Sequence, residues 1–284
     1  MYKQIYTERP FHFTKHSTIG CGGFAETAYY PKDEREVLSL LSAFRENWLA
    51  VGNLSNVLTA DEGTKRTVIC TKKLTEIRET DDGVFLSAGV TSGALLRYMQ
   101  ETGQSGAEFF AGIPCTVGGM LYMNGGAGGK YIADITKSVR ILRDGKIIDL
   151  PVEECAYSYK NSLFMRTDDF ILGGIFRLEK SDKDKVKGEI RRYLQKRAHL
   201  PQGKSMGCVF KNLQGVSAGA LIEQAGLKGV RVGGAKVSEL HANFILNDQN
   251  ASSADICTLI QEIKNAVYSK FGVVLEEEIR YIKE

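Results

Sequence analysis

The sequence has few of the residues that build metal sites and disulfide scaffolds. Its six cysteines are widely spread with no Cys-x-x-Cys pair, and it has only four histidines. Small disulfide-stabilised domains and zinc fingers are thereby excluded, and we expect no metal. Because scattered free thiols are typical of a reducing compartment, we also expect a cytoplasmic protein.

An excess of charge of one sign is also missing. The sequence has 37 basic and 34 acidic side chains, so its formal net charge is only +3. That is too small, by itself, to mark a nucleic-acid-binding surface. The first 13 residues include charged side chains and no long apolar run, unlike a signal peptide. We therefore expect no nucleic-acid partner and no secretion signal.

One uncharged stretch, residues 109–129, is long enough to cross a bilayer. It contains seven glycines and Pro114, which make it weakly apolar and a poor helix former. We therefore expect this stretch to be a buried segment of loop and strand, and we expect no membrane partner.

Glycine, in contrast with proline, is abundant: the sequence has 30 glycines and five prolines. Nine of these glycines lie in residues 103–129, without the Gly-X-Y repeat of collagen. Because glycine has no side chain, such a segment can bring its backbone against a flat, bulky ligand. A cofactor cradle and a tightly packed structural turn both remain open from these residues alone.

The composition, 43% hydrophobic and 25% charged, is that of a globular protein. Helical periodicity alternates with short strand-like runs, which predicts an α+β fold. The clearest helices are expected at residues 92–103, 180–197 and 256–271, the last closed by Gly272. Strands are expected at residues 49–51, 68–70, 84–88, 139–142, 170–178, 209–211 and 243–246.

A turn rich in hydrogen-bond donors follows the strand expected at residues 49–51. It contains Gly52, Asn53, Ser55 and Asn56. A glycine with positive φ can direct consecutive backbone N–H groups into one concavity, which suits a diphosphate. On these residues alone, a plain turn is an equally good interpretation.

Two further segments contain reactive side chains. Residues 207–212 place Cys208, Lys211 and Asn212 within one short run. In a regular strand Cys208, Phe210 and Asn212 would share one face. A lone cysteine is most often a small buried hydrophobe, and His241 is more simply explained as structural. The glutamates at 276–278 would usually form a solvated face, but in an extended segment one of them can face a site.

Together these blocks resemble the family of UDP-N-acetylenolpyruvoylglucosamine reductases, over almost the whole chain. The resemblance rests on order and spacing as well as on residue type. The motifs that carry it lie at residues 17–20, 111–114, 117–119, 123–124, 218–229, 233–238 and 241–244. The modest length is similar to the shorter subclass of the family.

The resemblance implies an α+β chain with two FAD-binding subdomains, residues 1–72 and 73–180, and a substrate-binding domain, residues 181–284. It implies FAD and NADPH as cofactors and UDP-N-acetylglucosamine enolpyruvate as substrate. The product would be UDP-N-acetylmuramate, a precursor of peptidoglycan, which links the chain to cell-wall biogenesis, cell shape and division. The implied cofactor-binding residues are Gly52, Asn53, Leu54, Ser55, Asn56, Val57, Gly112, Ile113, Pro114, Thr116, Val117, Gly118, Gly119, Asn124, Gly126 and Ala127.

The resemblance also implies catalytic residues. Glu278 matches the catalytic glutamate, Lys160 stands where the family has an arginine, and Cys208 replaces the usual serine proton donor. Tyr159, Lys211 and Asn212 match substrate-contacting positions. A thiol is a stronger acid than an alcohol and stays mostly protonated at neutral pH, so the replacement suits proton donation.

Some positions depart from the family. Leu54 and Cys115 stand where glycine is usual, Gly128 replaces an aromatic residue, and Leu213 replaces a proline. Lys160 keeps the positive charge of arginine but not its bidentate fork. Two alternatives are therefore kept, a related FAD-dependent oxidase or dehydrogenase of a small alcohol and a non-catalytic nucleotide-sugar binding protein. We expect a monomer.

Overall fold

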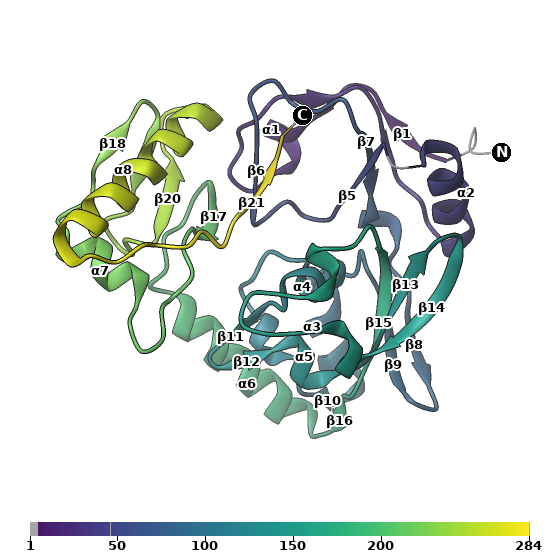
Figure 1. Cartoon of the computed structure of the whole chain (residues 1–284). Coiled ribbons are helices and arrows are strands. Elements are labelled where there is room, and N and C mark those ends of the chain that lie inside the picture. Colours follow the sequence, from purple (N-terminus) through teal and green to yellow (C-terminus); the bar gives the residue numbers. More distant parts are fainter. Residues whose placement is uncertain (1–4, 46, 284) are drawn as a thin grey trace. The chain divides into compact units, whose positions relative to one another are not determined.

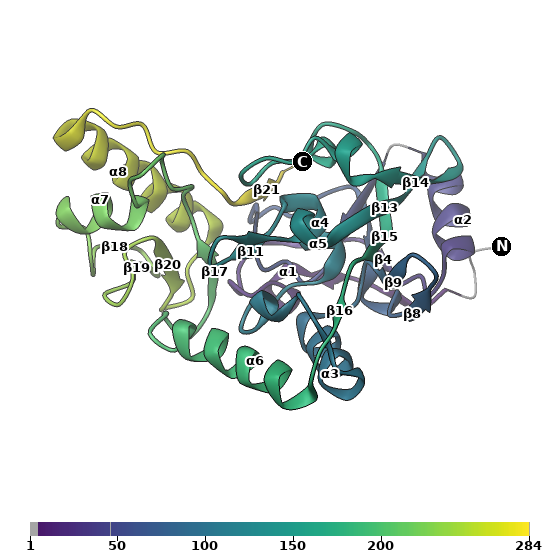
Figure 2. The same ribbon diagram turned by 90° about the horizontal axis from the view of Figure 1, so that it is seen from below.

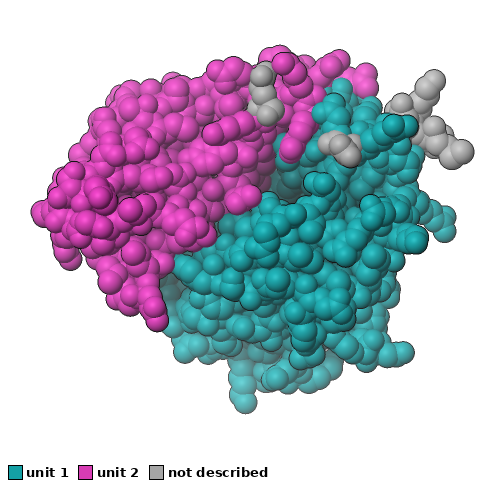
Figure 3. All heavy atoms as spheres, in the orientation of Figure 1, with its two compact units in different colours: residues 1–8, 27–53, 67–198 teal, residues 9–26, 54–66, 199–284 magenta. Residues whose placement is uncertain are grey.

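The computed structural model describes residues 5–45 and 47–283, so the first four residues of the subdomain expected at 1–72 lie outside the described residues. The chain forms two compact units that interleave along the sequence (Figure 3). Unit 1 comprises residues 1–8, 27–53 and 67–198, and unit 2 comprises residues 9–26, 54–66 and 199–284. Both contain helices and strands, which confirms the α+β prediction. The division at residues 72 and 180 stays a prediction.

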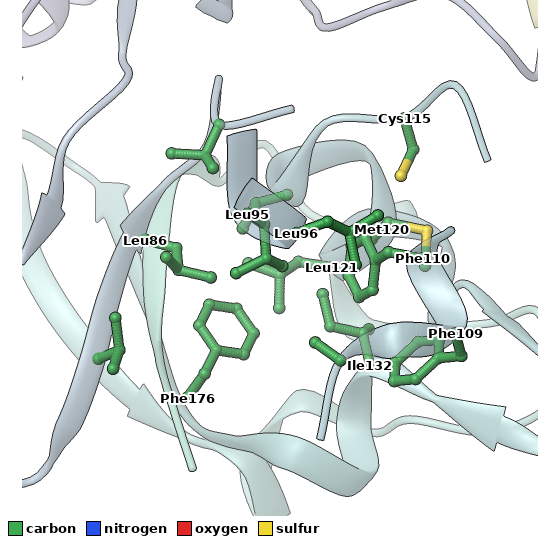
Figure 4. Packing of buried hydrophobic residues seen from close by; sticks show 14 of the residues in the cluster. Leu86, Leu95, Leu96, Phe109, Phe110, Cys115, Met120, Leu121, Ile132 and Phe176 are labelled. Atoms are coloured by element: carbon green, nitrogen blue, oxygen red, sulfur yellow. The ribbon is translucent and has the colours of Figure 1, made fainter. Parts of the chain in front are cut away.

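The larger sheet of unit 1 has five antiparallel strands in the order β14-β13-β15-β9-β8. Helices α3, α4 and α5 lie beside it (Figure 1). Figure 4 shows the apolar core of this layer, which includes Leu86, Phe109, Phe110 and Phe176. The elements are β8 (Ile77–Thr80), β9 (Gly83–Ser87), α3 (Ser92–Thr102), α4 (Val117–Met123), α5 (Ile132–Ile135), β13 (Thr136–Arg143), β14 (Lys146–Pro151) and β15 (Phe170–Phe176).

A smaller sheet of unit 1 has the order β1-β4-β7-β5, with β7 parallel to both β4 and β5. Helix α2 begins at the cap Asp33 and buries Val37 and Leu40. The elements are β1 (Thr7–Glu8), β4 (Ala28–Tyr29), α2 (Glu34–Phe44), β5 (Trp48–Val51) and β7 (Thr67–Cys70).

The charged helix α6 (Lys183–Arg197) belongs to unit 1, where it packs against α3 and the short η3 helix (Figure 2). It buries Val186, Ile190 and Tyr193 as the periodicity predicts. The same 3.6-residue periodicity predicts that Leu194 completes this apolar stripe, but Leu194 is 46% exposed, so that part of the prediction is wrong. The shorter elements of unit 1 are η2 (Thr71–Lys73), β10 (Gln104–Ser105), η3 (Glu108–Phe110), β11 (Gly126–Ala127), β12 (Lys130–Tyr131), η4 (Val152–Cys155), η5 (Leu163–Met165) and β16 (Glu179–Lys180).

Unit 2 is built on an antiparallel sheet in the order β17-β20-β19-β18, with helices α7 and α8. Helix α8 ends at Gly272, whose φ of 68° is the left-handed cap that the sequence predicts. Two strand pairs complete the unit, β2 with β3 and β6 with β21. The elements are β2 (Phe11–His12), α1 (Phe13–His16), β3 (Phe24–Ala25), β6 (Val57–Thr59), β17 (Ser205–Cys208), α7 (Ala218–Gln224), β18 (Arg231–Val232), β19 (Ala235–Val237), β20 (Phe244–Asn247), α8 (Ser253–Phe271) and β21 (Arg280–Ile282).

The uncharged stretch at residues 109–129 contains a helix, contrary to the expectation of loop and strand alone. Helix α4 forms there because Thr116 caps its start and Asn124 ends it with a φ of 44°. Within residues 5–45 and 47–283, no helix has the length and apolar character needed to cross a membrane.

Candidate active site

Two of the glycine-containing segments singled out in the sequence meet in unit 1. A Cβ on Gly52, after β5, would overlap the hydroxyl of Thr116, before α4. The side-chain amide of Asn53 donates a hydrogen bond to the carbonyl oxygen of Pro114 at 2.9 Å. Glycine is therefore required at position 52 by close approach, and the two segments form one connected surface.

The start of α4 is fixed against the larger sheet of unit 1. The N–H of Gly118 donates to the carbonyl of Ala88 at 2.8 Å, and a Cβ on Gly118 would lie 2.9 Å from the Cβ of Ala88. Cys115 and Val117 are buried beneath, whereas Gly112, Pro114 and Gly119 are exposed. The result is an exposed edge of backbone with almost no side chains, which fits a flat ring system.

Cys115 causes no backbone strain, although it stands where the family has glycine. Its φ is not positive, and its side chain lies at the edge of the apolar cluster (Figure 4). Burial raises the pKa of its thiol to about 12. The departure from glycine at this position is therefore absorbed by packing, and the thiol stays protonated.

The glycines at the C-terminal end of the glycine-rich segment, residues 103–129, have a structural explanation. Gly128 and Gly129 form the two-residue turn between β11 and β12, both with positive φ, 64° and 81°. That is the geometry of a tight hairpin turn, which glycine favours. The amide of Asn124 donates to the carbonyl of Ser158 at 2.9 Å, so this side chain links α4 to the next segment. Cofactor binding by Asn124, Gly126 and Ala127 stays a prediction.

Lys160 lies in a tight turn of unit 1. Ser158 and Asn161 exchange backbone hydrogen bonds at 3.2 Å, and Lys160 has a φ of 53° between them. Tyr159, in the same turn, is 42% exposed and meets the ring of Tyr131 edge-on. Tyr159 and Lys160, which are neighbours in the sequence, therefore lie in one tight turn.

The rest of the loop that follows β5 belongs to unit 2, and Leu54 begins it. Leu54 is buried and has a φ of 50°, a left-handed conformation that disfavours a branched side chain. This explains why glycine is usual here in the family that the sequence resembles. Two residues later, the side-chain amide of Asn56 donates to the carbonyl oxygen of Glu278 at 3.1 Å.

The segments that contain Cys208 and Glu278 lie side by side in unit 2. The N–H of Glu278 donates to the carbonyl of Val209 at 2.7 Å, and the N–H of Lys211 donates to the carbonyl of Glu276 at 2.8 Å. Two predicted catalytic residues more than 60 positions apart in the sequence are thus placed on neighbouring backbones.

The three consecutive glutamates have different environments. Glu276 is exposed and forms an ion pair with Lys211. Glu277 accepts hydrogen bonds from the Nζ of Lys264 at 2.8 Å and the hydroxyl of Tyr281 at 2.6 Å. Burial alone would raise the pKa of Glu277, but these bonds and the charge of Lys264 lower it below its usual value. Glu276 and Glu277 thus have charged or hydrogen-bonded partners within unit 2, and the catalytic role of Glu278 stays a prediction from the motif.

The prediction that side chains at residues 208–212 alternate between the two faces of a regular strand is wrong. Val209 and Phe210 are both fully buried, so the segment does not have one apolar and one polar face. Gly207 has a φ of 74°, and the register between β17 and β20 shifts here, which ends the strand at Cys208 instead of continuing it through 209–211. Cys208 itself is only partly buried, which agrees with a role beyond filling the core.

Asn243 is a positioning residue that sequence reasoning missed. Its side chain accepts from the N–H of Phe210 at 2.9 Å and donates to the carbonyl of Phe210 at 2.8 Å. Its own carbonyl accepts from the N–H of Val209 at 2.9 Å. The available signal was an asparagine directly before an apolar run, residues 244–246. It holds the backbone that follows Cys208.

Two other polar residues of unit 2 have structural contacts. The carbonyl oxygen of the Asn212 side chain accepts from the N–H of Ala218 at the start of α7, at 3.0 Å. The Nδ1 of His241 accepts from the N–H of Asn243 at 3.3 Å, and burial lowers the pKa of this histidine. These contacts agree with a structural His241, whereas substrate contact by Asn212 stays a prediction.

The prediction of no metal did not take account of His12 and His16, which are four residues apart. In unit 2 His16 stacks on the ring of Phe11 and His12 lies near the ring of Phe24. In the part of the chain that the structure describes, no three His, Cys, Asp or Glu side chains are grouped so that they could hold a metal ion.

Comparison with known proteins tests the family resemblance and the two alternatives that the sequence left open. Residues 25–151 match a family model described as FAD binding domain, and residues 198–282 match the C-terminal domain of UDP-N-acetylenolpyruvoylglucosamine reductase. The reductase of Pelobacter propionicus is 36% identical over 95% of this chain and 94% of its own length. The reductase of Carboxydothermus hydrogenoformans is 37% identical over 95% of this chain and 92% of its own length.

The chain belongs to the UDP-N-acetylenolpyruvoylglucosamine reductase family.

The solved structures agree with this membership. The crystal structure of the reductase from Thermus caldophilus matches 98% of this chain and 100% of its own, with a TM-score of 0.85 and 29% identity. The two matched segments include both glycine-containing loops, Cys208 and Glu278. Tyr159 and Lys160 lie outside the two matched segments, so their roles depend on the motif alone.

Proposed function

We propose that this chain is an FAD-dependent oxidoreductase that uses NADPH to reduce UDP-N-acetylglucosamine enolpyruvate to UDP-N-acetylmuramate. The observation that carries the proposal is identity of 36% over 95% of the chain with a reductase of this name. The alternative oxidase of a small alcohol lacks such support. A role in peptidoglycan synthesis, and through it in cell shape and division, follows from this reaction.

The residues present fit FAD. Gly112, Pro114 and Gly119 form an exposed edge with few side chains, and this edge lies within the segment that matches an FAD binding domain. We assign the cofactor to the two loops at residues 52–57 and 112–119, with Asn124, Gly126 and Ala127 at the end of the second. FAD bound there would supply the hydride chemistry, with NADPH as the reductant.

The substrate defines what the protein residues must do. Its double bond gains a hydride at the carbon remote from the carboxylate and a proton at the carbon next to it. Negative charge develops on the carboxylate side during this addition, and acids or cations placed there stabilise it. We assign that role to Glu278 and Lys160.

Cys208 supplies the proton in this proposal. The Sγ–H bond breaks, the proton goes to the carbon next to the carboxylate, and the thiolate is then reprotonated from water. A thiol with a reference pKa near 8.5 is protonated at neutral pH and so can donate. Tyr159, Lys211 and Asn212 are assigned to substrate contacts.

Oxidation of NADPH by the purified, FAD-loaded protein tests the function. We expect slow oxidation alone and rapid oxidation when UDP-N-acetylglucosamine enolpyruvate is added, with one product formed per NADPH consumed. A yellow protein whose flavin is reduced by a small alcohol and not by NADPH would favour the alternative oxidase or dehydrogenase. A colourless protein that cannot be reconstituted with FAD would favour the non-catalytic nucleotide-sugar binding protein.

We further propose a monomeric enzyme of the cytoplasm. All six cysteines are free, which suits a reducing compartment. Size-exclusion chromatography with light scattering tests the monomer, and a mass of 31.4 kDa is expected for the protein without cofactor.

A further inference from the structure

Glu278 lies where the C-terminal segment changes its strand partner. Up to Glu278, the segment pairs with the backbone of residues 209–211. Glu276 accepts from the N–H of Lys211, the N–H of Glu278 donates to Val209, and Glu277 forms an antiparallel bridge with Phe210. After it, β21 pairs in parallel with β6. At such a change of partner, the N–H of Glu278 is satisfied by the first neighbour and its carbonyl oxygen needs a different donor.

The side chain of Asn56 is that donor. Its Nδ2 lies 3.1 Å from the carbonyl oxygen of Glu278. The backbone carbonyl oxygen of Asn56 accepts from the N–H of Arg280 at 2.9 Å. Asn56 therefore bonds on both sides of Ile279, which is buried, and both backbone polar groups of Glu278 are held.

The neighbours of Asn56 make this attachment firm. Leu54 is buried two residues before it, and Val57 begins β6 immediately after it. An amide can donate to the carbonyl without adding charge close to the carboxylate of Glu278. An aspartate of the same size could not donate, and a lysine would place a cation there.

We propose that Asn56 is a positioning residue for Glu278, in addition to lying in the loop assigned to FAD. Its amide fixes the backbone of Glu278 between the Cys208 segment and this loop. The inference rests on the proposed function, because it takes Glu278 as a catalytic residue. It goes beyond that function by assigning the Asn56 side chain to the glutamate instead of to the cofactor.

Hydrogen exchange of the cofactor-free, full-length protein gives the first test. In Asn56→Ala, we expect the amides of residues 278–280 to exchange about tenfold faster, because local opening no longer breaks the side-chain bond. Asn265→Ala is the matched control, since Asn265 is exposed on α8 and its side-chain oxygen accepts from Gln261 of the same helix. It should leave exchange at 278–280 unchanged. Unchanged exchange in Asn56→Ala would overturn the inference.

A double-mutant cycle with Glu278→Gln gives the second test. Asn56→Ala alone should slow reoxidation of the reduced flavin by the enolpyruvyl substrate about tenfold. In the Glu278→Gln background the same change should alter reoxidation by less than about twofold, because the carboxylate it positions is gone.

The outcomes separate the two proposals. Equal losses in both backgrounds would show that Asn56 acts through the cofactor or the fold, and would overturn the positioning role. A wild-type protein whose reduced flavin is not reoxidised by the substrate would instead overturn the proposed function. If Asn56→Ala fails to fold, Asn56→Ser keeps a polar group but is too short to reach the carbonyl, and its results are interpreted in the same way.

Discussion

The hydroxyl of Thr116 occupies the space that a side chain on Gly52 would need. The two residues are 64 positions apart in the sequence. Gly52 directly follows β5, and Thr116 caps the start of α4. Their close approach joins the two loops that we assign to FAD. It also makes the chain sensitive to a single methyl group at position 52.

Substitution Gly52→Ala should therefore destabilise the protein and weaken FAD binding. The added methyl displaces Thr116, so we expect the free energy of unfolding to fall by about 1–3 kcal/mol. Gly188→Ala is the matched control, because Gly188 lies inside α6 with nothing within 4 Å of its added Cβ. That change should stabilise by about 1 kcal/mol. Urea unfolding and FAD titration measure both, and a neutral Gly52→Ala would contradict the close approach.

The left-handed conformation of Leu54 predicts an unusual order of stability. Leu54→Ala and Leu54→Gly both lose the buried side chain, but only glycine also relieves the φ of 50°. We expect the glycine variant to be more stable than the alanine variant by about 1 kcal/mol. At Leu58, buried in β6 with an ordinary φ, the order should be reversed. Thermal unfolding of the four variants tests this, and alanine above glycine at position 54 would refute it.

Cys208→Ala should separate the two half-reactions. Without the thiol we expect reoxidation of the reduced flavin by the substrate to slow by about 100-fold, while its reduction by NADPH changes little. Cys257→Ala, on the exposed side of α8, should leave both rates unchanged. Stopped-flow absorbance measures each step. Normal turnover in Cys208→Ala would mean that the thiol only fills space.

Glu277 predicts a pH-dependent contribution to stability. Its pKa is lower in the folded protein than in the unfolded chain, so its stabilisation is complete above the unfolded value of about 4.3 and is lost as pH falls through the folded value. We expect Glu277→Gln to lower the free energy of unfolding by about 1–3 kcal/mol at neutral pH and by progressively less below about pH 4. Urea unfolding at several pH values tests this; a difference independent of pH would assign the effect to packing.

The local elements were largely predictable from the sequence. Thr91 and Gly103 bound α3, and Gly272 ends α8, because caps act over a few residues of chain. The helix α4 was missed because its glycines disfavour it intrinsically, whereas Thr116, Asn124 and packing on Ala88 stabilise it in place. The strand at 209–211 was wrong because a bulge at Gly207 and bonds from Asn243 replace regular pairing.

The candidate site depended on both levels. By itself, the sequence determined the α+β class and the family, since motif order and local periodicity are properties of the chain, and it proposed Cys208, Lys160 and Glu278 as catalytic candidates. Only the tertiary structure decided that Thr116 occupies the space of a side chain on Gly52. It also decided that the N–H of Glu278 donates to Val209 and that the carbonyl oxygen of Glu278 accepts from the side chain of Asn56. The physical reason is distance: steric exclusion and hydrogen bonds act over a few ångströms, and only folding brings residues 56, 209 and 278 that close together.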